Sequence, residues 1–361
     1  MKKLTTEVLI IGAGPAGCTA AQMAAHHNLQ TILVDRQKFP RDKTCGDGIS
    51  LSSMVQLQNL GFDTKTILNN PKLIQSKNIY FYDQKDERID LKNNLFFTFK
   101  RNDFDNLLWE NLNQKINKIE QAEPVSIEKT DSGYHVIIEN SGEKIEIETK
   151  YLVGADGYSS YVRRNLFPNL PIEKRVASRF YLKDENFDTD AYHFYFHEKV
   201  SPGYFWIFNV GKNEFNTGVY LPYNIASKEL FELHNYYIQK YFERNIDKDN
   251  FYTWPIPNNF DFNSLASENA FLIGDAAGLC DKLIGHGIDA AILSGIVAIN
   301  SLIFHSTKNT KNYPLQEIFR YNMTAYFKDS LSHSAEVYEK IFNDINKSNQ
   351  HLKKYFNDVL H

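Results

Sequence analysis

The stretch that decides the fold is VLIIGAGPAG, Val8–Gly17. Its apolar, β-branched start predicts a buried strand, its glycines predict a tight turn, and residues 18–27 have the composition of a helix. A second strand is expected over Thr31–Val34, and Asp35 ends it. Strand, glycine-rich turn, helix, strand and terminal acid, in this order, are typical of a dinucleotide-binding β-α-β unit.

Each residue of the turn has a physical reason. Gly12 permits the tight turn, Gly14 lets a pyrophosphate approach the backbone, and Gly17 lets helix and strand pack closely. The helix N-terminus attracts the anion, and Asp35 can accept hydrogen bonds from ribose hydroxyls. The alternative is a purely structural glycine turn, but the agreement of strand, helix and acid favours dinucleotide binding.

The composition limits the class of protein. With 361 residues, two domains are expected, and a formal net charge of −4 argues against a nucleic-acid partner. The three cysteines include no C-x-x-C pair, so we predict neither a disulfide framework nor a metal site, and a reducing, cytoplasmic location. The apolar stretch 290–304 is shorter than a membrane span and predicts a buried helix.

The composition changes near Phe180, where the chain becomes rich in aromatic residues. Between Phe180 and Trp254, 22 of 75 residues are aromatic, about twice the 14% of the whole chain. Alternation over 192–196 and 204–208 predicts strands with one face on an apolar space. We interpret this region as a substrate domain, although an ordinary sheet core is the alternative for any single aromatic residue.

Three further motifs favour FAD as the dinucleotide. The segments Gly154–Gly157 and Gly274–Gly278, the latter followed by Gly287 and Ile288, resemble the second and third fingerprints of the para-hydroxybenzoate hydroxylase superfamily. Arg101 resembles the arginine that this superfamily uses against FAD. The resemblance implies a flavoprotein oxidoreductase.

Within that superfamily, the chain resembles the geranylgeranyl reductase family up to about residue 295. KTCGDGIS, Lys43–Ser50, is similar to the family's P-C-G-[GD]-G-[IL]-S segment, and GYFWIF, Gly203–Phe208, to its Y-x-W-x-F-P motif. The chain departs from the family's pattern at Thr44, Asn209, Lys282 and His286. These departures leave the substrate less defined than the cofactor.

The resemblance implies an α/β fold in which a Rossmann-like FAD-binding domain is interleaved with an α+β antiparallel-sheet substrate domain. The FAD-binding domain is expected over 1–75, 98–175 and 265–305, the substrate domain over 76–97 and 176–264, and C-terminal helices over 306–361.

The resemblance also implies the site residues. Cys45 would lie near the isoalloxazine, and Tyr204 and Trp206 would line an apolar tunnel that fits an isoprenoid; these three are the candidate catalytic residues. For Cys45 the alternative is a small buried hydrophobe. His286 either tunes flavin charge, relays a proton or is a turn histidine facing solvent. The candidate cofactor-binding residues are Gly12, Ala13, Gly14, Pro15, Ala16, Gly17, Asp35, Arg36, Cys45, Gly46, Asp47, Gly48, Arg101, Val125, Asp156, Gly274, Asp275, Gly285, Gly287 and Ile288.

The leading hypothesis is therefore an FAD-dependent reductase of carbon–carbon double bonds in a prenyl or other hydrophobic substrate. A flavin monooxygenase or halogenase, and a flavin- or lipid-binding protein without catalysis, are the alternatives. The external reductant is open between NAD(P)H and a ferredoxin, and the proton donor between Tyr204, Cys45 and water. A hydrophobic substrate would bring transient contact with a membrane surface.

Overall fold

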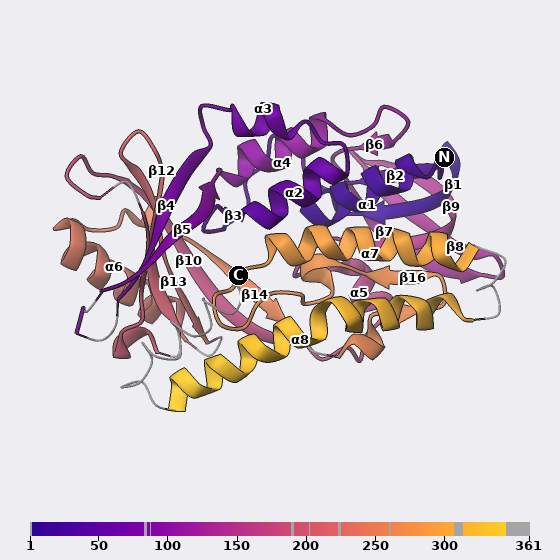
Figure 1. The fold of residues 1–361 in the computed structure, drawn as a ribbon. Coiled ribbons are helices and arrows are strands. Elements are labelled where there is room, and N and C mark those ends of the chain that lie inside the picture. The colour runs from indigo at the N-terminus through magenta and orange to yellow at the C-terminus, as the bar shows by residue number, and fades with distance from the viewer. Residues whose placement is uncertain are drawn as a thin grey trace.

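The protein is built on two eight-stranded sheets. The computed structural model describes residues 2–82, 85–86, 88–188, 191–201, 203–222, 225–259, 261–306 and 313–343. The sheets lie at opposite ends of the molecule, with helices between and along them (Figure 1). Of the C-terminal segment predicted to be helical, residues 307–312 and 344–361 lie outside the described residues.

The first sheet has the predicted Rossmann-like form, and its central strands run parallel in the order β16-β9-β1-β2-β6. The carboxyl ends of β1, β2 and β9 therefore meet at one edge, which is where such sheets bind ligands. The hairpin of β7 and β8 extends the sheet beside β9. The strands are β1 Lys2–Ile11, β2 Thr31–Val34, β6 Asn117–Ile119, β7 Ala122–Thr130, β8 Gly133–Asn140, β9 Glu143–Gly154, β15 Ala266–Ser267 and β16 Ala270–Leu272.

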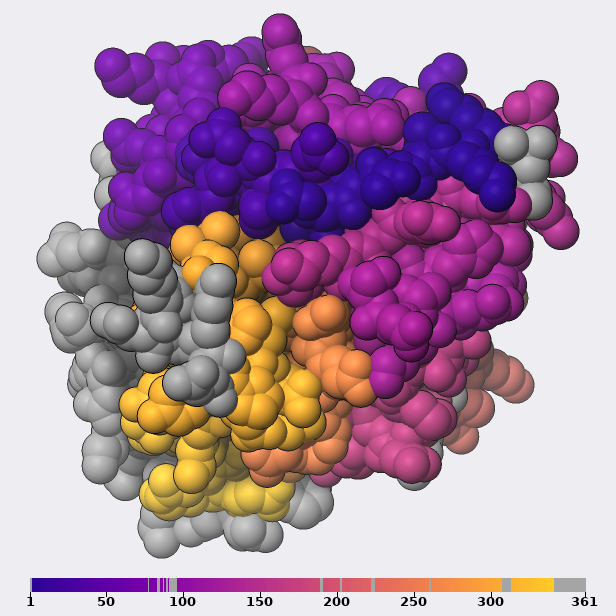
Figure 2. Space-filling model, turned by 90° about the vertical axis from the view of Figure 1, so that its right-hand side faces the viewer, coloured from indigo at the N-terminus to yellow at the C-terminus, as the bar shows by residue number. Residues whose placement is uncertain are grey.

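Distant parts of the chain close this sheet. Helix α1, Pro15–His26, packs on α7, Ile288–Ser306, and α7 packs on α8, Leu315–Asn343. Figure 2 shows the indigo N-terminal segment against the orange segment that contains α7. A side chain at Gly295 would place its Cβ 2.4 Å from Thr19 Oγ1, so glycine permits the close approach of α1 and α7.

Helix α7 is the one described helix whose length and composition would allow it to cross a membrane. More than half of its apolar window is buried in the protein, between α1 and α8. A core helix passes the same test of length and hydropathy, and the burial agrees with the buried helix predicted for 290–304.

The second sheet has the order β14-β10-β13-β12-β11-β4-β5-β3. Its neighbouring strands are antiparallel except for the parallel pair β4 and β11. β3 comes from the range predicted for the FAD-binding domain, yet it pairs with β5 in this sheet. The strands are β3 Gly48–Ser50, β4 Ile74–Tyr82, β5 Arg88–Thr98, β10 Glu173–Lys183, β11 Ala191–Tyr195, β12 Tyr204–Gly211, β13 Glu214–Pro222 and β14 Tyr252–Asn258.

Alternation along the second sheet creates two apolar faces. Phe205 and Ile207 face helix α6, Ser227–Phe242, whereas Tyr204 and Trp206 face the first sheet. The remaining helices are α2 Leu51–Asn59, α3 Thr64–Leu68, α4 Arg101–Glu110 and α5 Tyr161–Leu166, with 3₁₀ turns at Glu198–Val200, Lys248–Asn250, Phe262–Ser264 and Gly274–Ala276.

Candidate functional site

Two adjoining cavities lie between the sheets, of about 630 and 410 Å³. The smaller one follows the carboxyl edge of the first sheet, and the larger one reaches the aromatic face of the second sheet. Residues lining both are Pro15, Lys43, Thr44, Arg101, Trp254, Asp275 and Ala291. The cavities therefore meet along one seam and can hold one elongated ligand together with a second molecule.

The glycine-rich turn forms the floor of the smaller cavity. Gly12 has φ +101°, and a Cβ there would lie 2.3 Å from the carbonyl oxygen of Ala155. A Cβ at Gly17 would lie 1.8 Å from the carbonyl oxygen of Gly12. Gly14, by contrast, would meet only an arginine side chain, at 3.6 Å, so this backbone stays approachable from the cavity. These contacts agree with the reasons given for each glycine.

Asp35 ends β2 beside this turn and is buried. Its carboxylate accepts hydrogen bonds from the backbone N–H of Ala13, at 2.8 Å, and of Gln37, at 2.9 Å. The acid therefore joins the turn to the end of β2 while its side chain lines the cavity. Such a carboxylate has the placement that ribose hydroxyls require.

A cluster of cations lies on the other side of the turn. Arg101 makes a bidentate pair with Asp105, with both N···O distances 2.7 Å, and Arg41 Nη1 is 3.0 Å from the same carboxylate. Burial alone would raise the pKa of Asp105, but the two guanidinium groups lower it below its ordinary value. Among the described residues, Arg41 Nε is buried without a hydrogen-bond partner. This unpaired N–H of Arg41, together with the neighbouring guanidinium of Arg101, suits an anion such as pyrophosphate.

Two aspartates complete this wall. Asp156 accepts the backbone N–H groups of Tyr161 and Val162 at the start of α5. Burial raises its pKa. Asp275 lies 2.5 Å from Lys43 Nζ; burial opposes ionisation, but the ammonium group lowers the pKa of Asp275 below its ordinary value. Asp156 lines the smaller cavity, and Asp275 lines both cavities where they meet.

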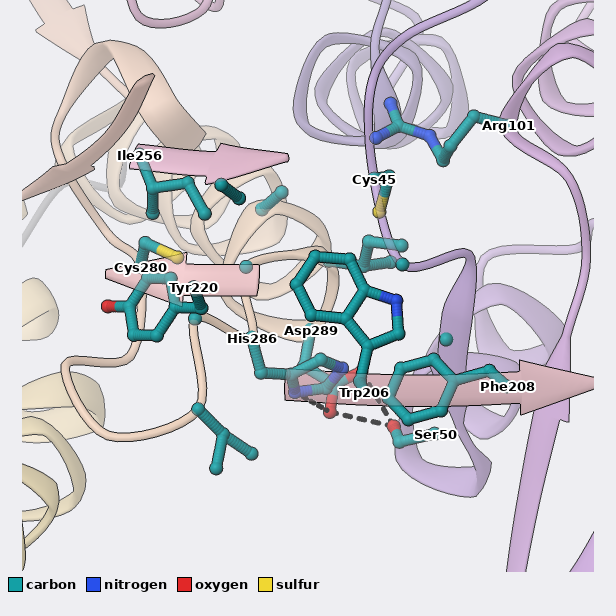
Figure 3. Close-up of a pocket in the computed structure, with 18 of the residues that line it drawn as sticks. Cys45, Ser50, Arg101, Trp206, Phe208, Tyr220, Ile256, Cys280, His286 and Asp289 are labelled. Carbon is teal, nitrogen blue, oxygen red and sulfur yellow. Dashed lines mark hydrogen bonds and ion pairs between the residues drawn. The ribbon is translucent and has the colours of Figure 1, made fainter. Parts of the chain in front are cut away.

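The larger cavity has an aromatic wall from the second sheet, and Figure 3 shows Trp206, Phe208 and Tyr220 around it, with Cys45 and Cys280 on other sides. A Cβ at Gly46 would lie 3.1 Å from Phe208, so the loop of residues 43–48 packs directly on this wall. The aromatic and aliphatic lining residues include Ile79, Phe96, Tyr192, Phe194, Tyr204, Trp206, Phe208, Tyr220, Trp254, Ile256 and Ile284.

Asn216 on β13 ties that loop to the wall, and sequence reasoning missed it. The buried amide accepts the indole N–H of Trp206 at 3.0 Å and donates to the Cys45 carbonyl and the Asp47 carboxylate, both at 2.8 Å. A buried amide must find hydrogen-bond partners, so an asparagine within an apolar strand was the available signal. The network fixes the position of Cys45 relative to Trp206.

Five of the predicted cofactor-binding residues line neither cavity, and two of these, Asp47 and Val125, have other contacts. Asp47 is fully buried, where it accepts hydrogen bonds from Tyr181, Asn216 and the backbone N–H of Arg101, and burial raises its pKa. Val125 is 39% exposed, and its carbonyl accepts the Tyr161 hydroxyl. Asp47 thus stabilises the loop of residues 43–48 from the side that faces away from the cavities.

The other predicted site residues lie around the cavities, and Pro15, Arg101 and Asp275 among them line both. Ala13, Gly17 and Gly274 support the turns without lining a cavity. The smaller cavity is lined by Gly12, Gly14, Pro15, Ala16, Asp35, Arg36, Arg101, Asp156 and Asp275. The larger one is lined by Cys45, Gly46, Gly48, Tyr204, Trp206, Gly285, Gly287 and Ile288. The arrangement brings the predicted dinucleotide-binding and substrate residues to one seam.

The chain is similar to known reductases. It is 26% identical over 333 residues to the digeranylgeranylglycerophospholipid reductase of Sulfolobus acidocaldarius, covering 84% of this chain and 70% of the relative. It is 27% identical over 328 residues to the menaquinone reductase of Mycobacterium tuberculosis, covering 82% and 76%. The predicted resemblance to the geranylgeranyl reductase family is confirmed by these matches.

Solved structures share the fold. A geranylgeranyl bacteriochlorophyll reductase-like protein from Thermoplasma acidophilum superposes with a TM-score of 0.82 at 21% identity, over 94% of this chain and 88% of that chain. A flavin-dependent brominase superposes with a TM-score of 0.78 at 14% identity, over 98% and 93%. A family model described as an FAD binding domain matches residues 5–307, so the chain belongs to the FAD-binding-domain family and is an FAD-dependent oxidoreductase.

Proposed function

We propose that this protein reduces carbon–carbon double bonds in a prenyl chain or a similar hydrophobic substrate. One observation carries the proposal: the larger cavity is aromatic and aliphatic, and the cations that line it are already paired. Lys43 faces Asp275, and Arg101 is held by the carboxylate of Asp105. An uncharged apolar chain gains about 25 cal/mol for each Å² that it buries there.

The relatives support a hydrophobic substrate. Their names give a digeranylgeranyl lipid in one case and menaquinone in the other as what those proteins reduce. The brominase shares the fold, so halogenation and oxygenation are the competing reactions. The unpaired Arg41 Nε, the approachable backbone at Gly14 and the carboxylate of Asp35 fit FAD in the smaller cavity.

FAD supplies hydride chemistry when it is bound. In our proposal, the turn of residues 12–17 and the N-terminus of α1 hold its pyrophosphate, Asp35 its adenosine ribose, and Asp275 its ribityl region. The protein's remaining task is to orient the substrate and exclude water. The wall of the larger cavity performs it, because Tyr204, Trp206 and Tyr220 are all nearly fully buried.

The three candidate catalytic residues receive different roles. The Tyr204 hydroxyl donates to the Ile284 carbonyl, and burial raises its pKa well above the ordinary value, so we assign this side chain to the wall. Trp206 packs against substrate with its N–H held by Asn216. Cys45 lines the cavity on the loop beside Arg101 and borders the substrate.

The cavity mouth suggests how a lipid enters. Leu51 lines the cavity and is 47% exposed, and Val55, one turn further along α2, is also 47% exposed. We propose that this apolar lip touches a membrane surface transiently while the protein remains cytoplasmic. The net charge of −4 disfavours a nucleic-acid partner. NAD(P)H or a ferredoxin delivers the electrons; adding each anaerobically and following the flavin absorbance distinguishes them.

The test uses FAD-loaded protein that is chemically reduced without oxygen and mixed with a geranylgeranyl lipid. We expect reoxidation of the flavin and a mass gain of two hydrogens for each reduced bond. An oxygen or halogen added to the product, when oxygen and halide are supplied, would overturn the proposal in favour of the competing reactions. The proposal would also be refuted if NAD(P)H or a ferredoxin reduced the flavin but the added lipid remained unchanged.

A cavity-filling variant sharpens the test. Ala177 lines the larger cavity and is 7% exposed, so Ala177→Trp should retain FAD and lose lipid reduction. Ala325 on α8 is exposed, and Ala325→Trp is the matched control that should behave as wild type. Equal turnover by both variants would contradict the placement of the substrate.

A further inference from the structure

A polar cluster interrupts the apolar wall of the larger cavity where helices α2 and α7 begin. Ser50 Oγ lies 2.6 and 2.7 Å from the two carboxylate oxygens of Asp289, and Ser53 donates to the same carboxylate. His286 Nδ1 lies 3.6 Å from Asp289 Oδ2. Figure 3 shows Ser50, His286 and Asp289 converging beside Trp206.

The cluster is placed between the cavity and solvent. Ser50, His286 and Asp289 all line the cavity, and the side chains of His286 and Asp289 are 29% and 28% exposed. The carboxylate is held by two serine hydroxyls, one of which caps α2. Asp289 is therefore a fixed acceptor that orients the imidazole through Nδ1 and leaves Nε2 for another partner.

The loop that carries His286 is anchored to the substrate wall. Tyr204 donates to the Ile284 carbonyl and Tyr220 to the Lys282 carbonyl, at 3.1 Å in the second case. The carbonyl of His286 accepts the backbone N–H of Asp281. Both tyrosine hydroxyls are thus engaged, and burial raises their pKa well above the ordinary value, which makes them poor proton carriers.

Most of the other titratable side chains around the cavity are held in ion pairs or kept neutral by burial. These side chains come from the loop of residues 42–48, from α4, from the second sheet and from the segment before α7. They are Lys43, Cys45, Arg101, Tyr192, Tyr204, Tyr220, Asp275 and Cys280. Lys43 and Arg101 are paired, and burial raises the pKa of Cys280. Histidine is the side chain that titrates between pH 5 and 8.

We infer that His286 is a catalytic acid of this protein and that Asp289 and Ser50 position it. The inference rests on the proposed function. Reduced FAD, when bound, would supply a hydride with its two electrons to one carbon of the double bond. The π electron pair then forms the bond from the second carbon to the proton of imidazolium Nε2–H, which leaves His286 neutral; water at the cavity mouth returns the proton.

The experiment compares His286→Gln with wild type in single-turnover lipid reduction from pH 5 to 9. We expect wild type to slow as His286 loses its proton, and the variant to be about 10²-fold slower with a flat profile, the usual range for general acid catalysis. His27→Gln, at an exposed position after α1, is the matched control. Imidazole added to His286→Gly should restore part of the rate.

A second measurement follows His286 without turnover. In FAD-loaded protein, the Cε1 resonance of His286 should move in the NMR spectrum of Asp289→Asn, because the carboxylate 3.6 Å from Nδ1 is lost. Wild-type rate and pH profile in His286→Gln would overturn the inference while leaving the proposed function intact. A wild-type protein that reduces no prenyl lipid would overturn both. A His286 resonance unchanged by Asp289→Asn would overturn the positioning role.

Discussion

Replacing Asn216 with leucine tests whether the substrate wall and the Cys45 loop act as one unit. Leucine has a similar volume but neither accepts nor donates a hydrogen bond. The change removes the partner of the Trp206 indole N–H and one hydrogen bond each from the Cys45 carbonyl and Asp47. Asp47 keeps its bonds from Tyr181 and the Arg101 backbone.

The expected cost follows from these three bonds. A buried N–H left without a partner costs about 1–3 kcal/mol, and each of the other two bonds contributes roughly 1 kcal/mol, so the sum is about 3–5 kcal/mol. At about 2.1 cal/mol/K for each residue, this predicts a Tm lower by roughly 4–7 °C for a chain of this length. The rate of lipid reduction should also fall, because the Cys45 loop and the aromatic wall are no longer held in fixed positions relative to each other.

Thermal unfolding by circular dichroism, FAD titration and single-turnover lipid reduction together measure the outcome. FAD affinity should stay within about threefold of wild type, since the smaller cavity is untouched. Asn165→Leu, at an exposed position on α5, is the control and should leave Tm unchanged. A Tm and turnover equal to wild type in Asn216→Leu would refute the reasoning.

Gly17→Ala should yield folded protein that binds FAD at least about tenfold more weakly, because its Cβ would lie 1.8 Å from the Gly12 carbonyl oxygen; fluorescence titration with FAD checks this, and unchanged affinity contradicts it. Gly218→Ala would place a Cβ 2.0 Å from Trp206 Cζ2, so lipid reduction should be lost while FAD binding remains; retained turnover would show that this wall is dispensable. Burial lowers the pKa of His234 to about 3, so the unfolded chain binds the additional proton below pH 6.5. Stability should therefore fall by about 1.4 kcal/mol per pH unit as the pH drops below about 6, and urea titrations of His234→Gln should show a shallower fall; parallel curves would contradict the assignment.

Much of the fold could be predicted because local patterns and tertiary structure agree. The turn of residues 12–17 and the strand Thr31–Val34 are found where the sequence indicates. The helix from Ile288 and the aromatic strands of the second sheet are also confirmed. In each case one short segment contains its own periodicity and its own stop signal.

The rest depends on partners distant in the chain. The pairing of β3 with β5 could not be read from a three-residue strand, and it draws residues 48–50 into the second sheet. Asp47 occurs within a recognised motif, yet its neighbours Tyr181 and Asn216 turn it into a buried support. The sequence did not indicate Arg41 as a site residue for the same reason, because its ion pair with Asp105, at 3.0 Å, joins residues far apart in the chain.

The closure of the first sheet by late segments has a consequence for biosynthesis. β1 ends at Ile11, but its neighbour β9 ends at Gly154, and α7, which packs on α1, ends at Ser306. At about 5–20 residues per second, a ribosome needs roughly 7–30 s to supply β9 after β1, and about twice as long for α7. During that interval the nascent β1 edge is open to wrong pairing. The chain can therefore capture its flavin only near the end of translation, and premature termination before α7 should leave a product for proteases.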